Sequence, residues 1–544
     1  MNKSDIEIPF PEDRHFRYRL FEALPGIITW FVLALPFILS VINPFAAAFF
    51  ILGYLLLWFA KSIGLDIRAI QGYRTIKQHE ALPWLEMLDE LQTGEIKPDR
   101  PNWHYSNIDR LVEAKAPIRL SNIVHAVVIA TYNESRATLE PTIQSVINSD
   151  FDKKKIILIL AYEERGGAEV EAQSKELVEQ YRHYFKHAIA IKHPKDLAGE
   201  MIGKGGNITY AGKQLAKYVE EQGINPIDVI VTTLDADNHP HSKYFSALSY
   251  MYCVTYDPVY VSYQPVAMFT NNIWDAPAPM RVIATGNSFW MTVSSMRQHV
   301  LRNFSAHAQS LQTLLDTNFW SVRTIVEDGH QFWRTYFRYN GNHEVYPIYL
   351  PVYQDAVLAN GYIRTLKAQF IQLRRWAWGA SDIAYVIETG FFKKNKVPKL
   401  NLSIKLLQLM EGHISWSTAP LSLAFSAFIP AIFNPQSYAA NQLPIVVSRL
   451  QTIALSGIFV TLLFSLKTLP PKPARYKMRK TIFMVVQWVY LPVTTILYNS
   501  LSALYSQTLL MLGKYLGKFD VTEKAVVTDE DKTVSVLPQT TKHE

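Results

Sequence analysis

The 544-residue sequence predicts an α/β domain with a mostly parallel, Rossmann-like sheet, placed between two groups of transmembrane helices. Two observations lead to this prediction. Long apolar segments lie near both ends of the chain, and short β-branched apolar runs alternate with amphipathic helical patterns between them. Hydrophobic residues make up 49% of the chain and charged residues only 19%, which excludes a disordered chain and a coiled-coil rod.

Two apolar segments near the N-terminus predict two transmembrane helices. Residues 24–42 carry no charge, and residues 45–60 follow directly after an Asn-Pro turn. Each segment is close to the roughly 20 residues that cross a bilayer as a helix. We therefore expect residues 1–61 to form an N-terminal tail and two spans.

Three apolar segments near the C-terminus predict further spans, at residues 414–433, 443–466 and 481–512. The last segment is too long for one simple span, so it forms either a hairpin or a span with an interfacial extension. Residues 414–512 are thus expected to hold three or four spans. The polar residues 513–544 are expected to form a disordered tail.

The charge distribution predicts the orientation of the chain in a plasma membrane. The loop at residues 467–480 carries six Lys and Arg residues and no acid. The positive-inside rule places this loop, the middle segment and both termini on the cytoplasmic side. Because topology accounts for most of the formal net charge of +7, no nucleic-acid partner is expected. Lysines interleaved with apolar residues near 391–413 predict an interfacial helix.

The middle segment, residues 62–413, has the pattern of a cytoplasmic α/β domain. Strands are predicted at residues 125–130, 155–160, 228–234 and 259–263, with helices at 139–148, 169–184 and 210–222. This alternation is typical of a mostly parallel sheet that is covered on both faces. Ligands bind such sheets at the carboxyl ends of the strands.

Asp235 and Asp237 follow the third predicted strand. Side chains at i and i+2 of an extended segment point the same way, so the two carboxylates are expected to converge. Such a pair can hold Mg²⁺ or Mn²⁺ and leave coordination positions for phosphate oxygens. The structural alternative is an Asx-rich turn that leaves the strand.

Other polar residues are expected at the same edge of the sheet. Those after the first two predicted strands are Thr131, Tyr132, Asn133, Glu134 and Glu163. The stretch from Lys204 to Asn207, which contains two glycines, opens a helical pattern. A helix N-terminus with a lysine favours a phosphate group, although a plain loop has the same composition.

Two later motifs supply further candidate residues. Glu327 and Asp328 follow an apolar pair, and a carboxylate there can take a proton from an attacking hydroxyl or merely cap a turn. Gln372, Arg375 and Trp376 share one face of a predicted helix. An arginine can bind a diphosphate and an indole can stack on a sugar, whereas the alternative is an amphipathic helix lying on the membrane.

In this order, the motifs T-Y-N-E, K-G-G-N, D-A-D, E-D and Q-x-x-R-W resemble the membrane-bound glycosyltransferase family 2. The sequence looks most like the branch of cellulose and hyaluronan synthases, over about residues 24–512. The resemblance implies a GT-A fold, a nucleotide-sugar donor and an inverting transfer to a hydroxyl. It also implies that Asp328 is the general base and that Asp235 and Asp237 bind Mg²⁺ or Mn²⁺.

The resemblance implies two binding regions. The donor would contact Thr131, Tyr132, Asn133, Glu134, Glu163, Lys204, Asn207, Asp235, Gln372 and Arg375. The acceptor would contact Trp376, Glu327, Asn287 and Trp290. The expected partners are a UDP-sugar as donor, a glycan or lipid-linked acceptor, and the lipid bilayer.

Three functions are consistent with these motifs. Q-x-x-R-W favours a processive synthase that exports its polysaccharide. The small number of spans and the lack of an F-x-V-T-x-K segment after the fourth span favour a single transfer to a lipid-linked acceptor. The third function is nucleotide binding without turnover in a transporter or scaffold, and Asp328 argues against it because binding alone needs no base.

Overall fold

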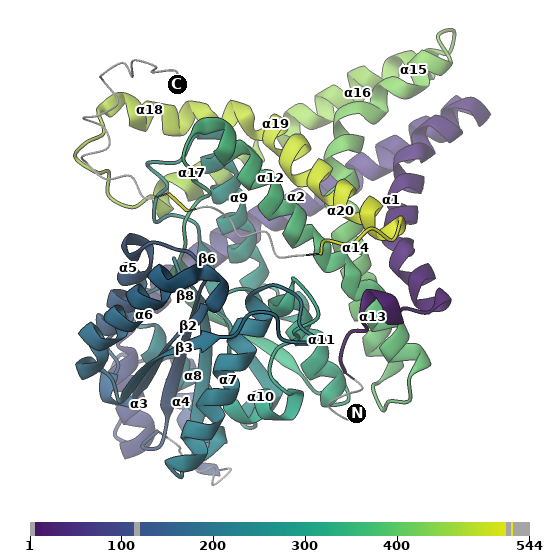
Figure 1. Ribbon diagram of the computed structural model, residues 1–544. Helices are drawn as coiled ribbons and strands as arrows, with labels where there is room; N and C mark the ends of the chain where they lie inside the picture. The colour runs from purple at the N-terminus through teal and green to yellow at the C-terminus, as the bar shows by residue number, and fades with distance from the viewer. Residues whose placement is uncertain (1–5, 114–119, 518–523, 526–544) are drawn as a thin grey trace, which may run out of the picture.

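The computed structural model describes residues 6–113, 120–517 and 524–525 (Figure 1). Its centre is an eight-stranded mixed sheet with the order β3-β2-β1-β4-β7-β6-β8-β5. The strands are β1 (Val124–Thr131), β2 (Ile156–Glu163), β3 (His187–His193), β4 (Val229–Asp235), β5 (His239–Pro240), β6 (Val261–Met268), β7 (Ala308–Ser310) and β8 (Glu344–Tyr353). Most neighbouring strands are parallel, whereas β7 is antiparallel to both of its neighbours and β5 to β8. The predicted mostly parallel, Rossmann-like α/β fold is confirmed.

Helices cover both faces of the sheet. On β1, Val127 and Ile129 belong to the core of one face, and Ala126 and Val128 to the core of the other. The first face is covered by α3 (Trp84–Thr93), α4 (Asn102–Glu113), α5 (Arg136–Ile147), α6 (Gly167–Tyr181) and α8 (Tyr244–Val254). The second is covered by α7 (Lys204–Glu221) and α10 (Leu311–Thr317). Burial on both faces explains why these strands are continuously apolar.

The helix α7 begins at Lys204, where the stretch from Lys204 to Asn207 was expected to open a helical pattern, and it includes the helix predicted from residue 210. Its first turn contains Gly205 and Gly206, although glycine is a poor helix former. A Cβ atom at Gly205 would lie 2.4 Å from the carbonyl oxygen of Ser321, so the close approach requires glycine. This approach places the N-terminus of α7 against the segment that leads into α11 (Glu327–Arg338).

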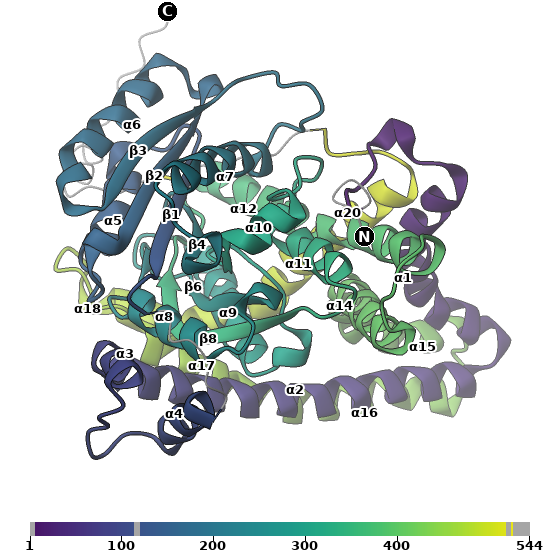
Figure 2. The ribbon, with the colours of Figure 1, turned by 90° about the horizontal axis from the view of Figure 1, so that it is seen from below.

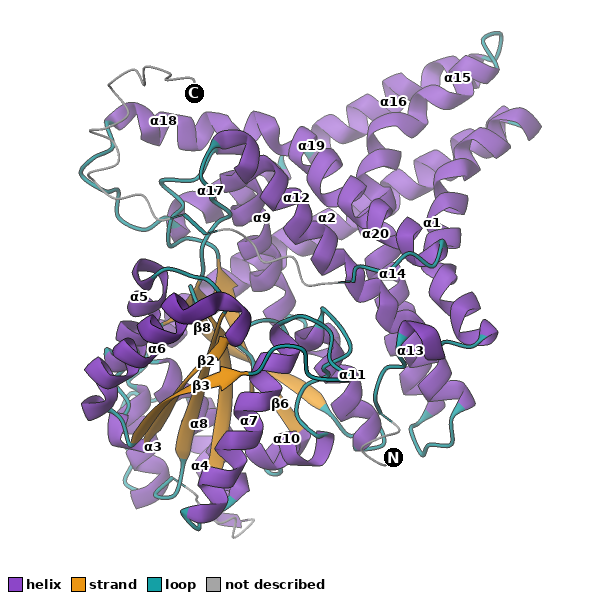
Figure 3. Cartoon of the chain, in the orientation of Figure 1, coloured by secondary structure: helices purple, strands orange, loops and turns teal. Residues whose placement is uncertain are grey.

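The apolar segments at both ends of the chain form five helical segments that are long and apolar enough to span a membrane. They are α1 (Phe16–Ile42), α2 (Pro44–Ala81), α14 (Lys399–Phe425) with α15 (Ile429–Phe433), α16 (Tyr438–Ala454) with α17 (Gly457–Thr468), and α18 (Met478–Val486) through α19 (Leu491–Thr494) to α20 (Leu501–Met511). Figure 3 shows this helical group beside and above the orange strands. Residues 478–511 form one bent helical segment, and the helix expected near 391–413 is continuous with the third span.

The sheet domain lies directly against this helical group. In Figure 2, α2, itself one of the five apolar segments, runs along the lower edge of the molecule from the side of α16 to α3. The helix α9 (Ala278–Ser295) packs on α2, and α12 (Tyr362–Ala377) packs on α20, where Ser506 donates a hydrogen bond to the Arg374 carbonyl. The short α13 (Asp382–Ile387) packs on α1. Two helices that carry predicted site residues, α9 and α12, are therefore supported by membrane helices.

Candidate active site

The carboxyl ends of β1, β2 and β4 meet at one edge of the sheet, as the sequence predicts. Asn207 on α7 links the first two ends, since its Nδ2 donates to the Ala161 carbonyl at 2.9 Å and to the Thr131 carbonyl at 3.4 Å. Its Oδ1 is buried and has no hydrogen-bond partner within the described residues. Asn207 thus holds the strand ends together and keeps one acceptor available.

Glu134 fixes the loop that follows β1. One oxygen of its carboxylate, Oε2, accepts hydrogen bonds from the Thr131 hydroxyl at 2.8 Å and from the backbone N–H groups of Tyr132 at 2.8 Å and Asn133 at 3.2 Å. The four predicted residues therefore form one closed turn at the end of the strand.

Glu163, at the end of β2, is held by two cations. Its Oε2 lies 2.6 Å from Nη2 of Arg165 and 3.2 Å from Nδ1 of His193, whose Nε2 lies 2.9 Å from Glu200. Burial alone would lower the pKa of His193, but Glu163 and Glu200 outweigh it and raise this pKa to about 9. Sequence reasoning missed His193 because its partners come from other segments of the chain.

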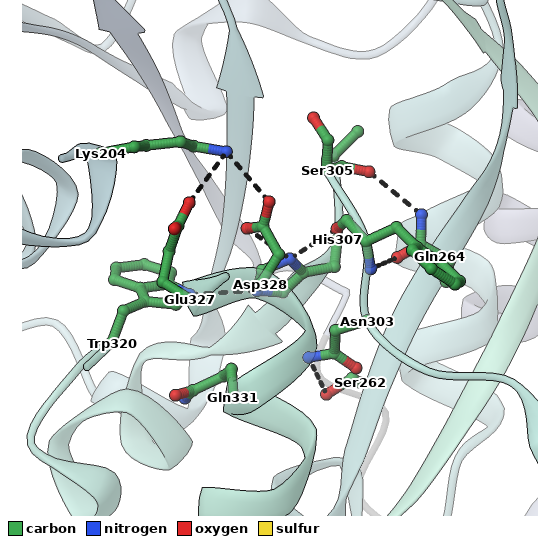
Figure 4. A network of polar contacts seen from close by, with 12 residues as sticks. Lys204, Ser262, Gln264, Asn303, Ser305, His307, Trp320, Glu327, Asp328 and Gln331 are labelled. Carbon is green, nitrogen blue, oxygen red and sulfur yellow. Dashed lines mark hydrogen bonds and ion pairs between the residues drawn. The ribbon is translucent and has the colours of Figure 1, made fainter. Parts of the chain in front are cut away.

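Lys204 lies close to three carboxylates, of which those of Glu327 and Asp328 are shown in Figure 4. Its Nζ is 2.9 Å from Asp235 Oδ1, 3.3 Å from Asp328 Oδ2 and 3.9 Å from Glu327 Oε1. Burial alone would lower the pKa of the ammonium, but the carboxylates raise it. Burial would likewise raise the pKa of Asp235, and the charge of Lys204 instead holds it well below its usual range. The structure thus brings four predicted site residues together.

Glu327 and Asp328 have different environments although they are neighbours at the start of α11. Burial, followed by repulsion from Asp328, raises the pKa of Glu327 to about 8, so its carboxyl keeps a proton at neutral pH. Asp328 forms an ion pair with Lys204 through Oδ2. Its Oδ1 is buried and makes no hydrogen bond to any described residue. This oxygen is available to accept a proton from a bound hydroxyl.

A neighbouring segment holds His307 and Ser305 against these carboxylates. His307 Nδ1 lies 2.9 Å from the Phe304 carbonyl, and its Nε2 accepts a hydrogen bond from Trp320 Nε1, so the ring has its proton on Nδ1 (Figure 4). Burial lowers its pKa and keeps it neutral, 3.5 Å from Asp328 Oδ1. Ser305 Oγ donates to Asp235 Oδ2 at 2.7 Å. Neither His307 nor Ser305 belongs to a sequence motif that would predict its place in the site.

Asp235 and Asp237 do not lie on an extended segment. The strand β4 ends at Asp235, and the next residues form a turn in which the Asn238 N–H donates to the Asp235 carbonyl at 3.1 Å. The predicted geometry was therefore wrong, and the turn is the alternative that the sequence left open. Each aspartate has its own lysine, since Lys524 Nζ lies 2.7 Å from Asp237 Oδ1.

The turn has the donor set of a hard divalent cation. No cluster of three or more His, Cys, Asp or Glu side chains with metal-binding geometry occurs within the described residues. Asp237 Oδ2 accepts the Asp355 N–H, and burial together with the Asp237 charge raises the pKa of Asp355 to about 7. Asp235 and Asp237 therefore fit Mg²⁺ or Mn²⁺ only as a site completed by water or by phosphate oxygens.

The Q-x-x-R-W residues lie on α12. Gln372 accepts a hydrogen bond from Gln369 at 3.1 Å, and the ring of Trp376 lies 6.0 Å from that of Phe269. The positive charge of Arg375 acts on Glu327, where it opposes the rise in that pKa. Arg374, by contrast, lies over Tyr505 of α20. Arg374 and Arg375 thus differ in their surroundings, since Arg374 packs on the apolar helix α20 and the charge of Arg375 reaches Glu327.

Asn287 and Trp290, predicted for the acceptor, lie on α9. Trp290 is 50% exposed, and the neighbouring Phe289 packs on Phe464 of α17. Within the described part of the chain, no hydrogen bond or ion pair connects Asn287 or Trp290 with the carboxylates around Lys204. The structure places these two residues near the membrane helices and does not join them to the site.

Comparisons with known proteins give similarities in structure alone. No family model matches the chain, and no curated protein matches its sequence. Among solved structures it is similar to the mannosyltransferase PcManGT from Pyrobaculum calidifontis in complex with GDP-Man and Mn²⁺, with 14% identity, a TM-score of 0.41, and coverage of 74% of this chain and 99% of that one. It is also similar to residues 1–349 of S. aureus TarS in complex with UDP-GlcNAc, with 11% identity, a TM-score of 0.35, and coverage of 72% and 93%. Values of this size assign no function to the chain.

Proposed function

We propose that this protein is an inverting GT-A glycosyltransferase of the membrane-bound family 2 type, which transfers a sugar from a nucleotide sugar to a hydroxyl at the cytoplasmic membrane face. The observation that carries the proposal is the different environment of two adjacent acids. Glu327 keeps its proton, whereas Asp328 is paired with Lys204 and has one buried oxygen without a hydrogen bond. Pairs of acids with separated pKa values are typical of acid–base sites.

The reaction follows from these positions. The acceptor hydroxyl oxygen forms a bond to the anomeric carbon of the donor while the bond from that carbon to the diphosphate breaks. The hydroxyl proton passes to Asp328 Oδ1, and the electron pair leaves with the diphosphate. Attack from the face opposite the leaving group inverts the configuration. Lys204 then lies between the base and the donor site, where its charge holds both Asp235 and Asp328 in place.

The donor would be bound at the carboxyl edge of the sheet. The turn from Thr131 to Glu134 and the Glu163 region would contact the nucleoside, of which uridine is the expected one, and Lys204 and Arg375 would contact the diphosphate. Gln372 would bind the donor beside Arg375. Asp235 and Asp237 would hold Mg²⁺ or Mn²⁺, which supplies positive charge to the leaving diphosphate.

On the acceptor side, Trp376 would stack on the sugar and Glu327 would donate a hydrogen bond to it. We place residues 62–413 and both termini in the cytoplasm, with the five apolar helices in the plasma membrane. Chain extension with export is the proposed product route. A single transfer to a lipid-linked acceptor is the second candidate, because only five helical segments of the described chain are apolar enough to span.

The test is turnover of a panel of nucleotide sugars with Mg²⁺ or Mn²⁺ by the full chain in nanodiscs, with the released nucleotide measured and the product sized. Asp328→Asn should keep donor binding, measured by calorimetry, and lose 10²–10⁴-fold in turnover, the usual contribution of a general base. The matched control is Asp109→Asn, since Asp109 is exposed on α4. Full turnover by Asp328→Asn would remove the proposed base, and a short glycolipid product would select the single-transfer route.

A further inference from the structure

Lys524 comes from the C-terminal tail and lies in the candidate metal site. Its Nζ is 2.7 Å from Asp237 Oδ1. The backbone of residue 524 also forms a parallel β-bridge with Leu358. In this bridge the Ala525 N–H donates to the Leu358 carbonyl at 2.8 Å. Leu358 belongs to the segment between β8 and α12, which also carries Asp355. The tail lysine is therefore held by a main-chain contact and an ion pair.

The surroundings of Lys524 are those of a cation site. Its side chain is only 17% exposed. Two segments bring acids together here: Asp237 lies on the turn after β4, and Asp355, on the segment after β8, donates its N–H to Asp237 Oδ2. Such a concentration of carboxylates needs a positive charge, and Lys524 supplies it.

A divalent ion at the same carboxylate would exclude this ammonium. Mg²⁺ binds carboxylate oxygens at about 2.0–2.1 Å, and Mn²⁺ prefers the same oxygen ligands. Such an ion on Asp237 Oδ1 would lie next to the position of Nζ, so two cations would share one oxygen in a mostly buried place. Their repulsion in a medium of reduced dielectric constant opposes joint binding.

We propose that Lys524 is the protein's own occupant of this cation site, so that the tail lysine and a divalent metal bind Asp237 in alternation. The inference rests on the proposed function and adds regulation to it: the donor site receives its metal only when Lys524 leaves Asp237. A tethered lysine competes as an intramolecular ligand, which makes it effective against low concentrations of free metal. Among the described residues, its backbone is held by the bridge to Leu358, of which the Ala525 N–H bond is part.

The test measures Mn²⁺ binding to the full chain in detergent, without donor, by electron paramagnetic resonance. Lys524→Gln should bind Mn²⁺ about 10-fold more tightly than the unaltered protein, because the metal no longer has to displace a charge-assisted contact. Lys514→Gln is the matched control, because Lys514 is exposed on the same tail and should leave the affinity unchanged. Asp237→Asn should bind Mn²⁺ weakly with either residue at position 524.

A second readout follows the tail itself. Mn²⁺ should accelerate hydrogen exchange of the Ala525 amide, which donates to Leu358 when the lysine is in place. Equal or weaker Mn²⁺ binding by Lys524→Gln, or unchanged exchange at Ala525, would overturn the proposal. Loss of turnover in Lys524→Gln with unchanged Mn²⁺ affinity would instead show a permanent cation that takes part in catalysis. Neither readout needs a turning-over donor, so the failure of this inference is separate from failure of the glycosyltransferase assignment.

Discussion

Replacing Lys204 by Met tests whether this lysine holds the site together. The substitution removes a buried ammonium and keeps a side chain of similar length. At an effective dielectric constant near 20, the attraction of the ammonium to Asp235 at 2.9 Å is about 6 kcal/mol and to Asp328 at 3.3 Å about 5 kcal/mol. Desolvation of the charges offsets most of this, and screening reduces the Asp235 contribution because that side chain is 35% exposed. We expect a net loss of about 3 kcal/mol, or roughly 150-fold in the folding equilibrium.

The assay is thermal unfolding in detergent, followed by tryptophan fluorescence at one scan rate over a pH series. Lys213→Met is the control, because Lys213 is exposed on the same helix. Lys204 lowers the pKa of Asp235, so without it this carboxyl binds a proton at a higher pH than in the unaltered protein, and the variant regains relative stability as the pH falls. The deficit should therefore be largest near neutral pH and shrink towards about pH 4. A variant that melts with the control at neutral pH, or a deficit that is independent of pH, would refute the reasoning.

Two further predictions concern groups whose pKa values are raised. Glu327→Gln should keep turnover within about 10-fold, in contrast to Asp328→Asn. It should also abolish the loss of rate as the pH rises through about 8, where the native carboxyl ionises. The pH–rate profile of each variant checks this, and a Glu327→Gln profile that still falls near that pH would contradict it. His193→Gln should lower the melting temperature below about pH 6.5 and have little effect above about pH 9. The stability that comes from a raised histidine pKa is complete below the pKa of the unfolded state and disappears as the pH rises through the pKa of the folded state. A difference in melting temperature that persists at pH 10 would exclude the charge of His193 as its cause.

The part of the fold that depends on local pattern could be predicted from the sequence. The strands β1, β2 and β4 are short apolar runs because both of their faces are buried, and they appear at the predicted places. The strand β3 was missed because most of its residues are only half-buried. The strand β8 was missed because Pro347 and Pro351 interrupt its pattern. The five apolar helices could be predicted because their length and composition can be read directly from the sequence.

The candidate site was predictable as a set of residue types, but its charge balance was not. Lys204, Asp235 and Asp328 stand in separate motifs, and only the fold shows that one ammonium serves both carboxylates. Nothing local distinguishes Glu327 from Asp328, because burial and a neighbouring charge set the pKa of Glu327. Lys524 lies in a segment whose composition predicts disorder, and its partner is 287 positions earlier in the chain.

The negative charge of the donor determines when Lys524 should leave Asp237. A nucleoside diphosphate brings several negative charges to an edge that already holds Asp235, Asp237 and Asp355, and the ammonium groups of Lys204 and Lys524, which already pair with Asp235 and Asp237, do not balance them. A divalent ion can, so nucleotide and metal should favour each other and together displace Lys524 from Asp237. Thermodynamic linkage then requires that each ligand raises the affinity of the other by the same factor. Mn²⁺ titrations with and without the nucleoside diphosphate product, and the reverse titrations, measure this factor, expected at about 10-fold or more. In Lys524→Gln, Mn²⁺ should already bind tightly without nucleotide, so its gain on adding nucleotide should be smaller; an equal gain in both proteins would mean that the lysine leaves for neither ligand.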